Sequence, residues 1–283
     1  MTELTVAQPT AANSGASATV RFQQKARVDA HTTTERVDTL VSELITAAHD
    51  IVVRHHLTYP EYDALKAWLV QVGADGEWPL FLDVFLEHVV EQVANADRQG
   101  SKGTIEGPYY VPGAPALPAQ TTLPMRQNEP GTPVRFTGQV RTVEDEAIPN
   151  ATIDIWHADD AGFYSQFAPG IPEWNLRGSV HVDDEGRFDI TTIEPAPYQI
   201  PTDGATGKLL AAAGWPAWRP AHFHVKVSAP GYRLITSQLY FDGGEHLGSD
   251  IASAVKPELI LHPKPAPDGT GHHVTYDFIL DAD

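Results

Sequence analysis

Residues 218–227 read Trp-Arg-Pro-Ala-His-Phe-His-Val-Lys-Val, and their second half alternates between apolar and polar side chains. Successive side chains of a β-strand point to opposite faces, so this run predicts a strand with one apolar and one polar face. The apolar face carries Phe223, Val225 and Val227, and the polar face carries His222, His224 and Lys226. The apolar face requires a hydrophobic core. Two imidazoles on the other face can bind one metal ion together, although two histidines in this spacing, without other evidence, more often have a structural role.

Composition limits the protein classes to which the chain can belong. Its 283 residues, 42% apolar and 9% aromatic, are enough for one large core or two modest ones. Because 37 acidic residues outnumber 19 basic ones and the net charge is -18, nucleic acids and anionic membranes would be repelled. The absence of cysteine excludes disulfides and thiolate metal sites, which leaves His, Tyr, Asp and Glu as ligands.

No targeting or membrane-spanning segment is evident in the sequence. The N-terminus lacks a basic stretch followed by an apolar run, and no 18 consecutive residues are apolar. We therefore expect a cytoplasmic protein without membrane insertion.

The first third of the chain reads as an N-terminal arm, residues 1–30, followed by a helical domain, residues 31–104. Thr32 with Glu35 predicts one capping box, and Thr58 with Glu61 predicts a second, whose helix Gly73 should end. A third helix is expected over residues 79–96. Its apolar positions occupy more than one side. These helices therefore predict a homodimer through residues 32–93.

Prolines then punctuate residues 108–133, and short alternating runs follow in a domain that we expect to span residues 105–283. Turn-rich segments separate these runs, with almost no helical pattern between them, so they predict an antiparallel β-sandwich. The expected strands cover residues 134–140, 152–156, 187–192, 223–228, 234–241 and 274–279.

Two tyrosines of this domain have unusual neighbours. Tyr164 follows an acidic turn, and Tyr198 lies among prolines. Most tyrosines are simply core or rim aromatics with a satisfied hydroxyl. Together with His222 and His224, however, they would suit a hard trivalent ion, because two phenolates supply the negative charge that neutral imidazoles lack.

Several ordered motifs resemble those of the intradiol ring-cleaving dioxygenases, and the similarity extends over most of the chain. The motifs are Gly-Thr-Ile-Glu-Gly-Pro-Tyr-Tyr at 103–110, Trp-His-Ala at 156–158, Phe-Tyr-Ser at 163–165, Asn-Leu-Arg-Gly at 175–178, Pro-Tyr at 197–198, Arg-Pro-Ala-His-Phe-His at 219–224 and Ser-Ala-Pro-Gly-Tyr at 228–232. The resemblance implies one non-haem Fe(III) per subunit, with Tyr164, Tyr198, His222 and His224 as its ligands. It also implies a β-sandwich catalytic domain and a helical dimerisation domain, often with a lipid at the dimer interface.

The resemblance further implies that the chain cleaves catechol with O2 to cis,cis-muconate, in aromatic-compound catabolism by the β-ketoadipate pathway. Tyr198 and a hydroxide would take the protons of the diol, and Tyr164 would stay on the metal. Arg219 would stabilise negative charge on the substrate, with Gln238 near it. The alternatives are that Arg219 pairs with an acidic neighbour and that Gln238 is only a ladder residue.

The substrate pocket implied by the resemblance is lined by Leu80, Asp83, Ile105, Gly107, Pro108, Tyr109, Ile200, Pro201, Ala252 and Ala254. Small residues at 252–254 would leave room for a ring substituent. The segment 105–109 resembles catechol-cleaving enzymes, whereas residues 201–204 and 219–222 are shared with hydroxyquinol- and chlorocatechol-cleaving ones. The preference among catechol, methylcatechols, chlorocatechols and hydroxyquinol therefore stays open.

Two further readings come from other classes of protein. One is a non-catalytic β-sandwich interaction module whose histidine pair binds zinc. The other is an Fe(II) enzyme of the extradiol type, with two histidines and one carboxylate as ligands, in which Glu245 would be the third ligand.

Overall fold

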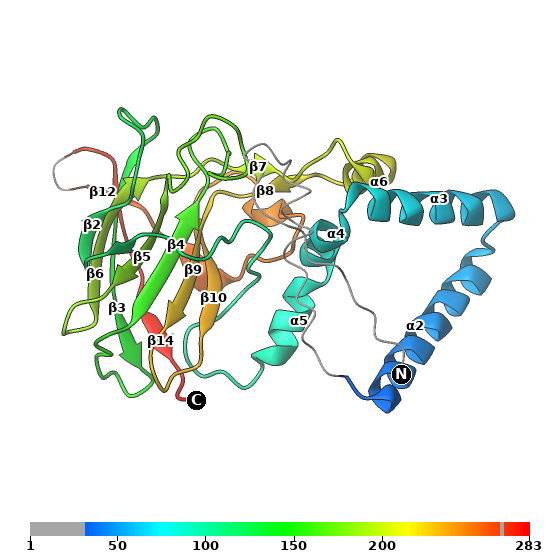
Figure 1. Cartoon of the computed structure of the whole chain (residues 1–283), viewed down its shortest axis with the longest axis horizontal. Helices are drawn as coiled ribbons and strands as arrows, with labels where there is room; N and C mark the ends of the chain where they lie inside the picture. The colour runs from blue at the N-terminus through cyan, green and yellow to red at the C-terminus, as the bar shows by residue number, and fades with distance from the viewer. Residues whose placement is uncertain (1–31, 267–268) are drawn as a thin grey trace.

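A helical layer lies on one side of the molecule and a β-sandwich on the other, with two short helices between them (Figure 1). The computed structural model describes residues 32–266 and 269–283. The N-terminal arm expected over residues 1–30 lies outside these described residues.

Two six-stranded sheets form the sandwich, as the alternating runs predict. The first sheet has the order β1 (Ala116–Leu117), β5 (Arg177–His181), β4 (Thr152–His157), β9 (His222–Ser228), β10 (Ile235–Phe241) and β11 (Ile260–Leu261). The second has the order β12 (Lys264–Pro265), β13 (His272–Thr275), β3 (Pro133–Thr142), β6 (Arg187–Ile193) and β2 (Gln120–Thr122), with β14 (Phe278–Leu280) also paired to β3. A separate ribbon joins β7 (Tyr198–Gln199) to β8 (Trp218–Arg219).

The alternation predicted for β9 is confirmed. Phe223, Val225 and Val227 are all fully buried in the core between the sheets. The ring of Phe223 lies 5.6 Å from that of Phe136 on the opposite sheet and 5.0 Å from that of Phe241 on the neighbouring strand. One face of β9 thus supports the sandwich, which leaves the histidine face free for other contacts.

The sandwich is not purely antiparallel. Its central pairs, β4 with β5, β4 with β9, β9 with β10 and β3 with β6, are antiparallel, whereas β1, β2, β11, β13 and β14 join the sheets in parallel. The run expected as one strand at 274–279 is divided between β13 and β14. A Cβ built on Gly138 would lie only 1.8 Å from the carbonyl oxygen of Tyr276, so the link between β13 and β14 packs closely against β3 at a glycine.

Five helices are present in the described part of the chain: α2 (Thr34–His55), α3 (Tyr59–Asp75), α4 (Trp78–Phe85), α5 (Glu87–Ala94) and α6 (Ala205–Ala213). The capping box of Thr58 and Glu61 is confirmed at the start of α3. The box expected for Thr32 is wrong. Thr33 caps α2 instead, because its hydroxyl accepts a hydrogen bond from the backbone N–H of Arg36 at 3.2 Å.

Two predicted helix ends are also wrong. Gly73 does not end α3, which runs on to Asp75 and ends at Gly76, where φ is 68°. The helix expected over 79–96 is interrupted at Leu86, whose φ of -124° lies outside the helical range. The interruption sets α5 in a new direction, in which the carboxylate of Glu87 accepts the backbone N–H of Glu106 at 2.8 Å.

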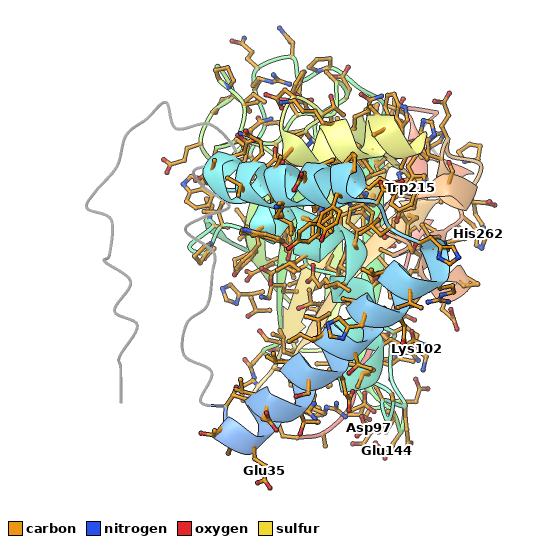
Figure 2. All side chains as sticks on the ribbon, turned by 90° about the vertical axis from the view of Figure 1, so that its right-hand side faces the viewer. Glu35, Asp97, Lys102, Glu144, Trp215 and His262 are labelled. Atoms are coloured by element: carbon orange, nitrogen blue, oxygen red, sulfur yellow. The ribbon has the colours of Figure 1, made fainter. Side chains whose placement is uncertain are left out.

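Helix α6 lies within a segment for which no helix is predicted, and two carboxylates of the helical layer hold its first turn. Asp75 accepts the backbone N–H of Ala205 at 3.1 Å, and Glu77 accepts that of Thr206 at 2.7 Å. Acidic side chains are favourable at this end because the helix dipole is positive there. Helices α3 and α6 consequently lie side by side, as Figure 2 shows, and the helical layer is fixed on the sandwich domain.

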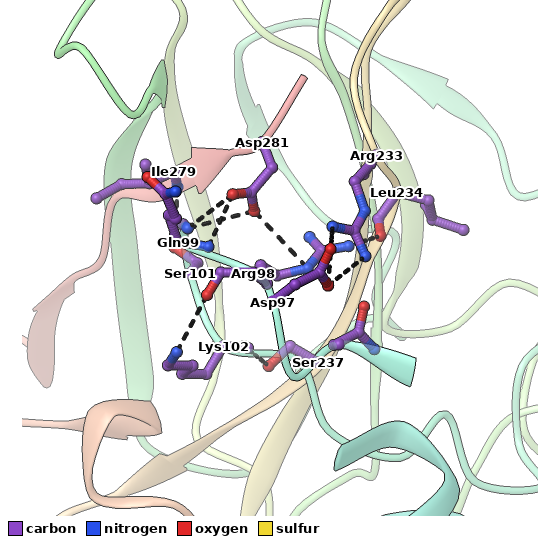
Figure 3. A network of polar contacts seen from close by, with 12 residues as sticks. Asp97, Arg98, Gln99, Ser101, Lys102, Arg233, Leu234, Ser237, Ile279 and Asp281 are labelled. Atoms are coloured by element: carbon purple, nitrogen blue, oxygen red, sulfur yellow. Dashed lines mark hydrogen bonds and ion pairs between the residues drawn. The ribbon is translucent and has the colours of Figure 1, made fainter. Parts of the chain in front are cut away.

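The connection from α5 to the sandwich is held by a polar network around Asp281 (Figure 3). The carboxylate of Asp281 accepts the backbone N–H of Gln99 at 2.8 Å, and Arg98 donates to the carbonyl of Leu234 at 2.8 Å. This network fixes residues 97–101 against the start of β10 and the C-terminal strand, so the segment that follows them enters the sandwich at a defined place.

Helix α2 lies apart from the sandwich (Figure 1) and has no buried residue. Its exposed apolar side chains are Val37, Leu40, Val41, Leu44, Ile45, Ile51, Val52 and Val53, with exposures between 42% and 72%. In the described residues no helix is both long and apolar enough to cross a membrane.

Candidate functional site

Four aromatic ligand candidates meet at the polar face of β9. His222 and His224 come from β9, Tyr198 from β7, and Tyr164 from the loop after β4. Their exposures lie between 0% and 6%. The two Nε2 atoms are 3.0 Å apart, and the Tyr164 hydroxyl is 2.9 Å from Nε2 of His224. Tyr164 also hydrogen bonds to Tyr198. Three segments that span residues 164 to 224 thus deliver four donor atoms to one point.

Parallel rings fix the planes of two of these side chains. Trp156 stacks on His224, with ring centroids 4.8 Å apart and an angle of 11° between the planes. Tyr109 stacks on Tyr164, with centroids 4.2 Å apart and an angle of 8°. Because aromatic rings packed in this way have little freedom to rotate, the donor atoms are held in place before any ion binds.

The hydrogen bonds of His222 define its tautomer. Its Nδ1 lies 2.7 Å from the carbonyl oxygen of Pro220, which can only accept, so Nδ1 carries the proton and Nε2 has a free lone pair. Burial, together with the positive charge of Arg219, lowers the pKa of His222 to about 3. The ring is therefore neutral at physiological pH, as metal ligation requires.

The two tyrosines differ in how easily they lose a proton. Burial raises the pKa of Tyr164, and its interactions with Tyr198 raise it further. Burial also raises the pKa of Tyr198, but Arg219 and the hydrogen bond from Tyr164 oppose this rise. Both would stay neutral phenols without a cation, so phenolate ligands at this site need a bound metal ion, and Tyr198 is the easier of the two to deprotonate.

The donor set fits a hard first-row metal ion. Neighbouring ligands at about 90° and bonded at about 2.1 Å would be separated by about 3.0 Å, close to the observed spacing of the donor atoms. No group of three or more His, Cys, Asp or Glu side chains placed to hold a metal ion occurs in residues 32–266 and 269–283. An ion at this site would therefore depend on the phenol oxygens, and phenolates are suited to a trivalent ion such as Fe(III).

Arg219 lies beside the four ring donors and is 2% exposed. Its Nη2 donates to Oε1 of Gln238 at 2.8 Å, and its guanidinium hydrogen bonds to the Tyr198 hydroxyl. It also forms an ion pair with Asp250, with a distance of 2.9 Å between Nε and Oδ1. Arg219 thus has an acidic partner in addition to its expected contact with Gln238. Gln238 is also a ladder residue, because it pairs with His224 between β9 and β10.

A small pocket opens beside this cluster, between α4 and the loop before β1. It is lined by Leu80, Asp83, Val84, Ile105, Gly107, Pro108, Tyr109, Tyr198, Ile200, Arg219 and Ala252. Pro201 and Ala254, expected in the lining, are absent from it, and Ala254 is buried in a small apolar cluster with Ala252 and Ile105. Ser253 is exposed, so Ala252 alone of residues 252–254 leaves room in the wall.

Four residues of this site are not predicted from the sequence. Val84 lines the pocket, Tyr240 donates to Oε1 of Gln238 at 2.8 Å, and Glu87 holds the backbone of the loop that carries Gly107. Asp250 is the partner of Arg219. Val84 follows Leu80 by one helical turn, so the periodicity of α4 could have indicated it. The others are isolated polar residues, and no local pattern shows where their side chains point.

Glu245, the third ligand of the alternative with two histidines and one carboxylate, is not part of the site. Its carboxylate is 82% exposed and lies 3.9 Å from the ring of His246. That reading is therefore wrong.

Comparison with known proteins finds similar sequences over most of the chain. A sequence model described as "Dioxygenase" matches residues 105–282, and one described as "Catechol dioxygenase N terminus" matches residues 34–102. A chlorocatechol 1,2-dioxygenase of Rhodococcus opacus is 42% identical over 250 residues, which cover 87% of this chain and 97% of that protein. A catechol 1,2-dioxygenase of Acinetobacter lwoffii is 33% identical over 81% of this chain and 84% of its own.

A similar structure has also been solved. The crystal structure of 3-chlorocatechol 1,2-dioxygenase from Rhodococcus opacus superimposes with a TM-score of 0.84 and 44% sequence identity. The match covers 89% of this chain and 100% of that one.

The tautomer of His222 can be tested in the metal-free protein. We predict that nitrogen-15 spectra show a protonated Nδ1 and an unprotonated Nε2, unchanged between pH 8 and pH 5, because the pKa is lowered to about 3. Since the folded pKa lies below the ordinary value near 6.5, the neutral ring's contribution to stability is complete above pH about 6.5 and declines as the pH falls toward 3. A ring that is protonated on both nitrogens at pH 6 would contradict the burial argument.

Proposed function

The chain belongs to the intradiol ring-cleaving dioxygenases, and on that premise we propose that its substrate is a chlorinated catechol. Cleavage between the two hydroxyl-bearing carbons, with both atoms of O2 retained, would give a chlorinated muconate. The observation that carries this proposal is the cluster of two histidines and two tyrosines beside an apolar pocket and Arg219. Catechol, the substrate expected first from the sequence, becomes the second candidate.

We infer that the resident ion is Fe(III), with Tyr164, Tyr198, His222 and His224 as ligands. When bound, this ion would chelate the two oxygens of the diol and activate it toward O2. The support comes from the chemistry of the donors, since the two phenolates would balance the charge of a trivalent ion that two neutral imidazoles could not.

The protein side chains would divide the remaining tasks. The phenolate oxygen of Tyr198 would accept a proton from one substrate hydroxyl, and Arg219, within hydrogen-bond distance of it, would favour negative charge at that place. Tyr164 would keep its position, because Tyr109 stacks on its ring. The apolar walls from α4 and β7 would exclude water from the reacting ring.

The preference for a chlorinated ring has two supports. The chlorocatechol 1,2-dioxygenase of Rhodococcus opacus shares more identity with this chain than the catechol 1,2-dioxygenase of Acinetobacter lwoffii does. In the pocket, Ala252 contributes only a methyl group to a lining that also includes the larger apolar side chains of Leu80, Val84 and Ile105. Burying a chlorine there instead of leaving an apolar gap would favour the substituted ring.

Steady-state kinetics with identified products test this proposal. We expect kcat/KM for 3- or 4-chlorocatechol to exceed that for catechol about tenfold, with a chlorinated muconate containing two oxygen-18 atoms from labelled O2. Ala252→Leu should abolish this preference by filling the space, whereas Ser253→Asn, a change at the exposed neighbour, should keep it.

Two outcomes would count against the proposal. A yellow semialdehyde product would mean extradiol cleavage. A preference for catechol over both chlorocatechols would leave the ring-cleavage chemistry intact but reject the substrate.

We also propose a homodimer formed through α2. A helix of 22 residues that buries none of them while exposing a row of Leu, Val and Ile is unusual on a free monomer. A second copy of this chain would cover that row. A lipid at the same interface is implied by the family resemblance and stays a prediction.

Analytical ultracentrifugation tests this assembly. We predict a dimer at micromolar concentration that Leu44→Glu converts to a monomer, because Leu44 is 71% exposed and a carboxylate there would be desolvated on pairing. Glu43→Gln, on the same helix, should remain dimeric. A wild-type monomer would mean that α2 stays uncovered.

The alternative function, a zinc-binding interaction module, is poorly supported. Both sequence models that match belong to an enzyme family, and two phenols beside two imidazoles make a poor zinc site.

A further inference from the structure

Asp250 is a buried carboxylate whose two oxygens are each shared between a side chain and the backbone. Oδ1 accepts Nε of Arg219 at 2.9 Å and the backbone N–H of Ala252 at 3.2 Å. Oδ2 accepts Nη2 of Arg219 at 3.2 Å and the backbone N–H of Ala254 at 3.0 Å. The side chain is 3% exposed. One carboxylate therefore ties the arginine of the site to the loop that carries a wall of the pocket.

The arginine depends on this carboxylate for its orientation. Two parallel N–H···O bonds fix the plane of the guanidinium as a single bond could not. In that plane, Nη2 reaches Gln238 at 2.8 Å and the Tyr240 hydroxyl at 3.3 Å, and the guanidinium also reaches Tyr198. Burial alone would raise the pKa of Asp250, but Arg219 and the two backbone donors hold it below its ordinary value. Asp250 is therefore charged at neutral pH.

The loop depends on the same carboxylate. Ser253 has a φ of 50°, in the left-handed region, which is unfavourable for a residue other than glycine. The bonds from Asp250 to the flanking N–H groups of Ala252 and Ala254 hold the chain in this turn. They also set the position of the Ala252 methyl group, which lines the pocket.

We propose that Asp250 is a positioning residue with two separable effects, orienting Arg219 for the reaction and setting the wall that selects the ring substituent. The inference rests on the proposed function for its substrates. The proposal predicts that a single residue, which contacts neither the substrate ring nor the ion, affects both the rate of cleavage and the preference between substituted and unsubstituted rings.

Asp250→Asn is the informative variant because neither orientation of the amide can replace the carboxylate. Each oxygen accepts one guanidinium N–H and one backbone N–H. Whichever oxygen becomes NH2, a donor will face both an arginine donor and a backbone donor, so one bond of each kind is lost. The variant therefore loosens the arginine and the loop together while preserving the volume.

The experiment measures kcat, and kcat/KM for 3-chlorocatechol and for catechol, in the iron-loaded enzyme. We expect Asp250→Asn to lower kcat about 100-fold, the size of effect that a misplacement of about 1 Å can have. The ratio of the two kcat/KM values should shift about tenfold toward catechol or away from it. Iron content and visible absorption should stay as in the wild type.

A double-mutant cycle with Arg219→Lys separates the two effects. Lysine cannot form the paired bonds, so adding Asp250→Asn to Arg219→Lys should cost less than about 3-fold further in kcat, while the substrate ratio still shifts. Losses in kcat that multiply would show that Asp250 does not act through Arg219. An unchanged ratio would show that it does not set the wall.

Asp277→Asn is the matched control. Asp277 also pairs with an arginine, 2.9 Å from Nη2 of Arg141, and accepts the backbone N–H of Gln139 at 2.9 Å, but it lies between β13 and β14, beside the second sheet. Its variant should leave kcat and the ratio unchanged. A comparable loss in this control would make the effect of Asp250 one of general stability and overturn the proposal.

If Asp250→Asn does not fold, Asp250→Glu supports the same comparison, because it keeps the charge but moves both sets of bonds by one methylene group. A fall in kcat with a shifted ratio is expected, and wild-type values would overturn the proposal. A wild-type enzyme that cleaves neither substrate would reject the proposed function instead, so the two failures are distinguishable.

Discussion

The two faces of β9 link the hydrophobic core to the candidate site. Phe223, Val225 and Val227 must lie in the core, and the period of two then directs His222 and His224 to the opposite face at complete burial. Buried imidazoles require partners. Pro220, Gln238 and Tyr164 supply them, and the site is arranged around these contacts.

This constraint explains how much could be predicted from the sequence. Strict alternation identified β9 and its two faces, and strong capping residues identified α3. Weaker local signals failed, because Thr33 was as good a cap as Thr32, and Leu86 interrupts a helix with no glycine or proline to mark the break. Helix α6 lacks a side-chain N-cap of its own and depends on Asp75 and Glu77, which lie more than 100 residues away. Such dependence leaves no local pattern.

The same limit applies within the site. The four ring donors could be predicted because their sequence neighbours are distinctive and the motifs around them resemble those of a known family. Asp250 and Glu87 could not, since their roles come from backbone groups that the fold brings to them. Burial also determines the chemistry. It keeps His222 neutral and disfavours both phenolates, so the tyrosines can serve as anions only when a cation offsets the cost of charge.

We propose that these tyrosines, as phenolates, hold Fe(III) together with the two histidines. A visible absorption spectrum of the purified iron-loaded protein, taken before and after the anaerobic addition of catechol, tests it most directly. We expect a red protein, coloured by charge transfer from tyrosinate to Fe(III), with a band that shifts when the diol binds. A colourless iron-loaded protein would contradict it.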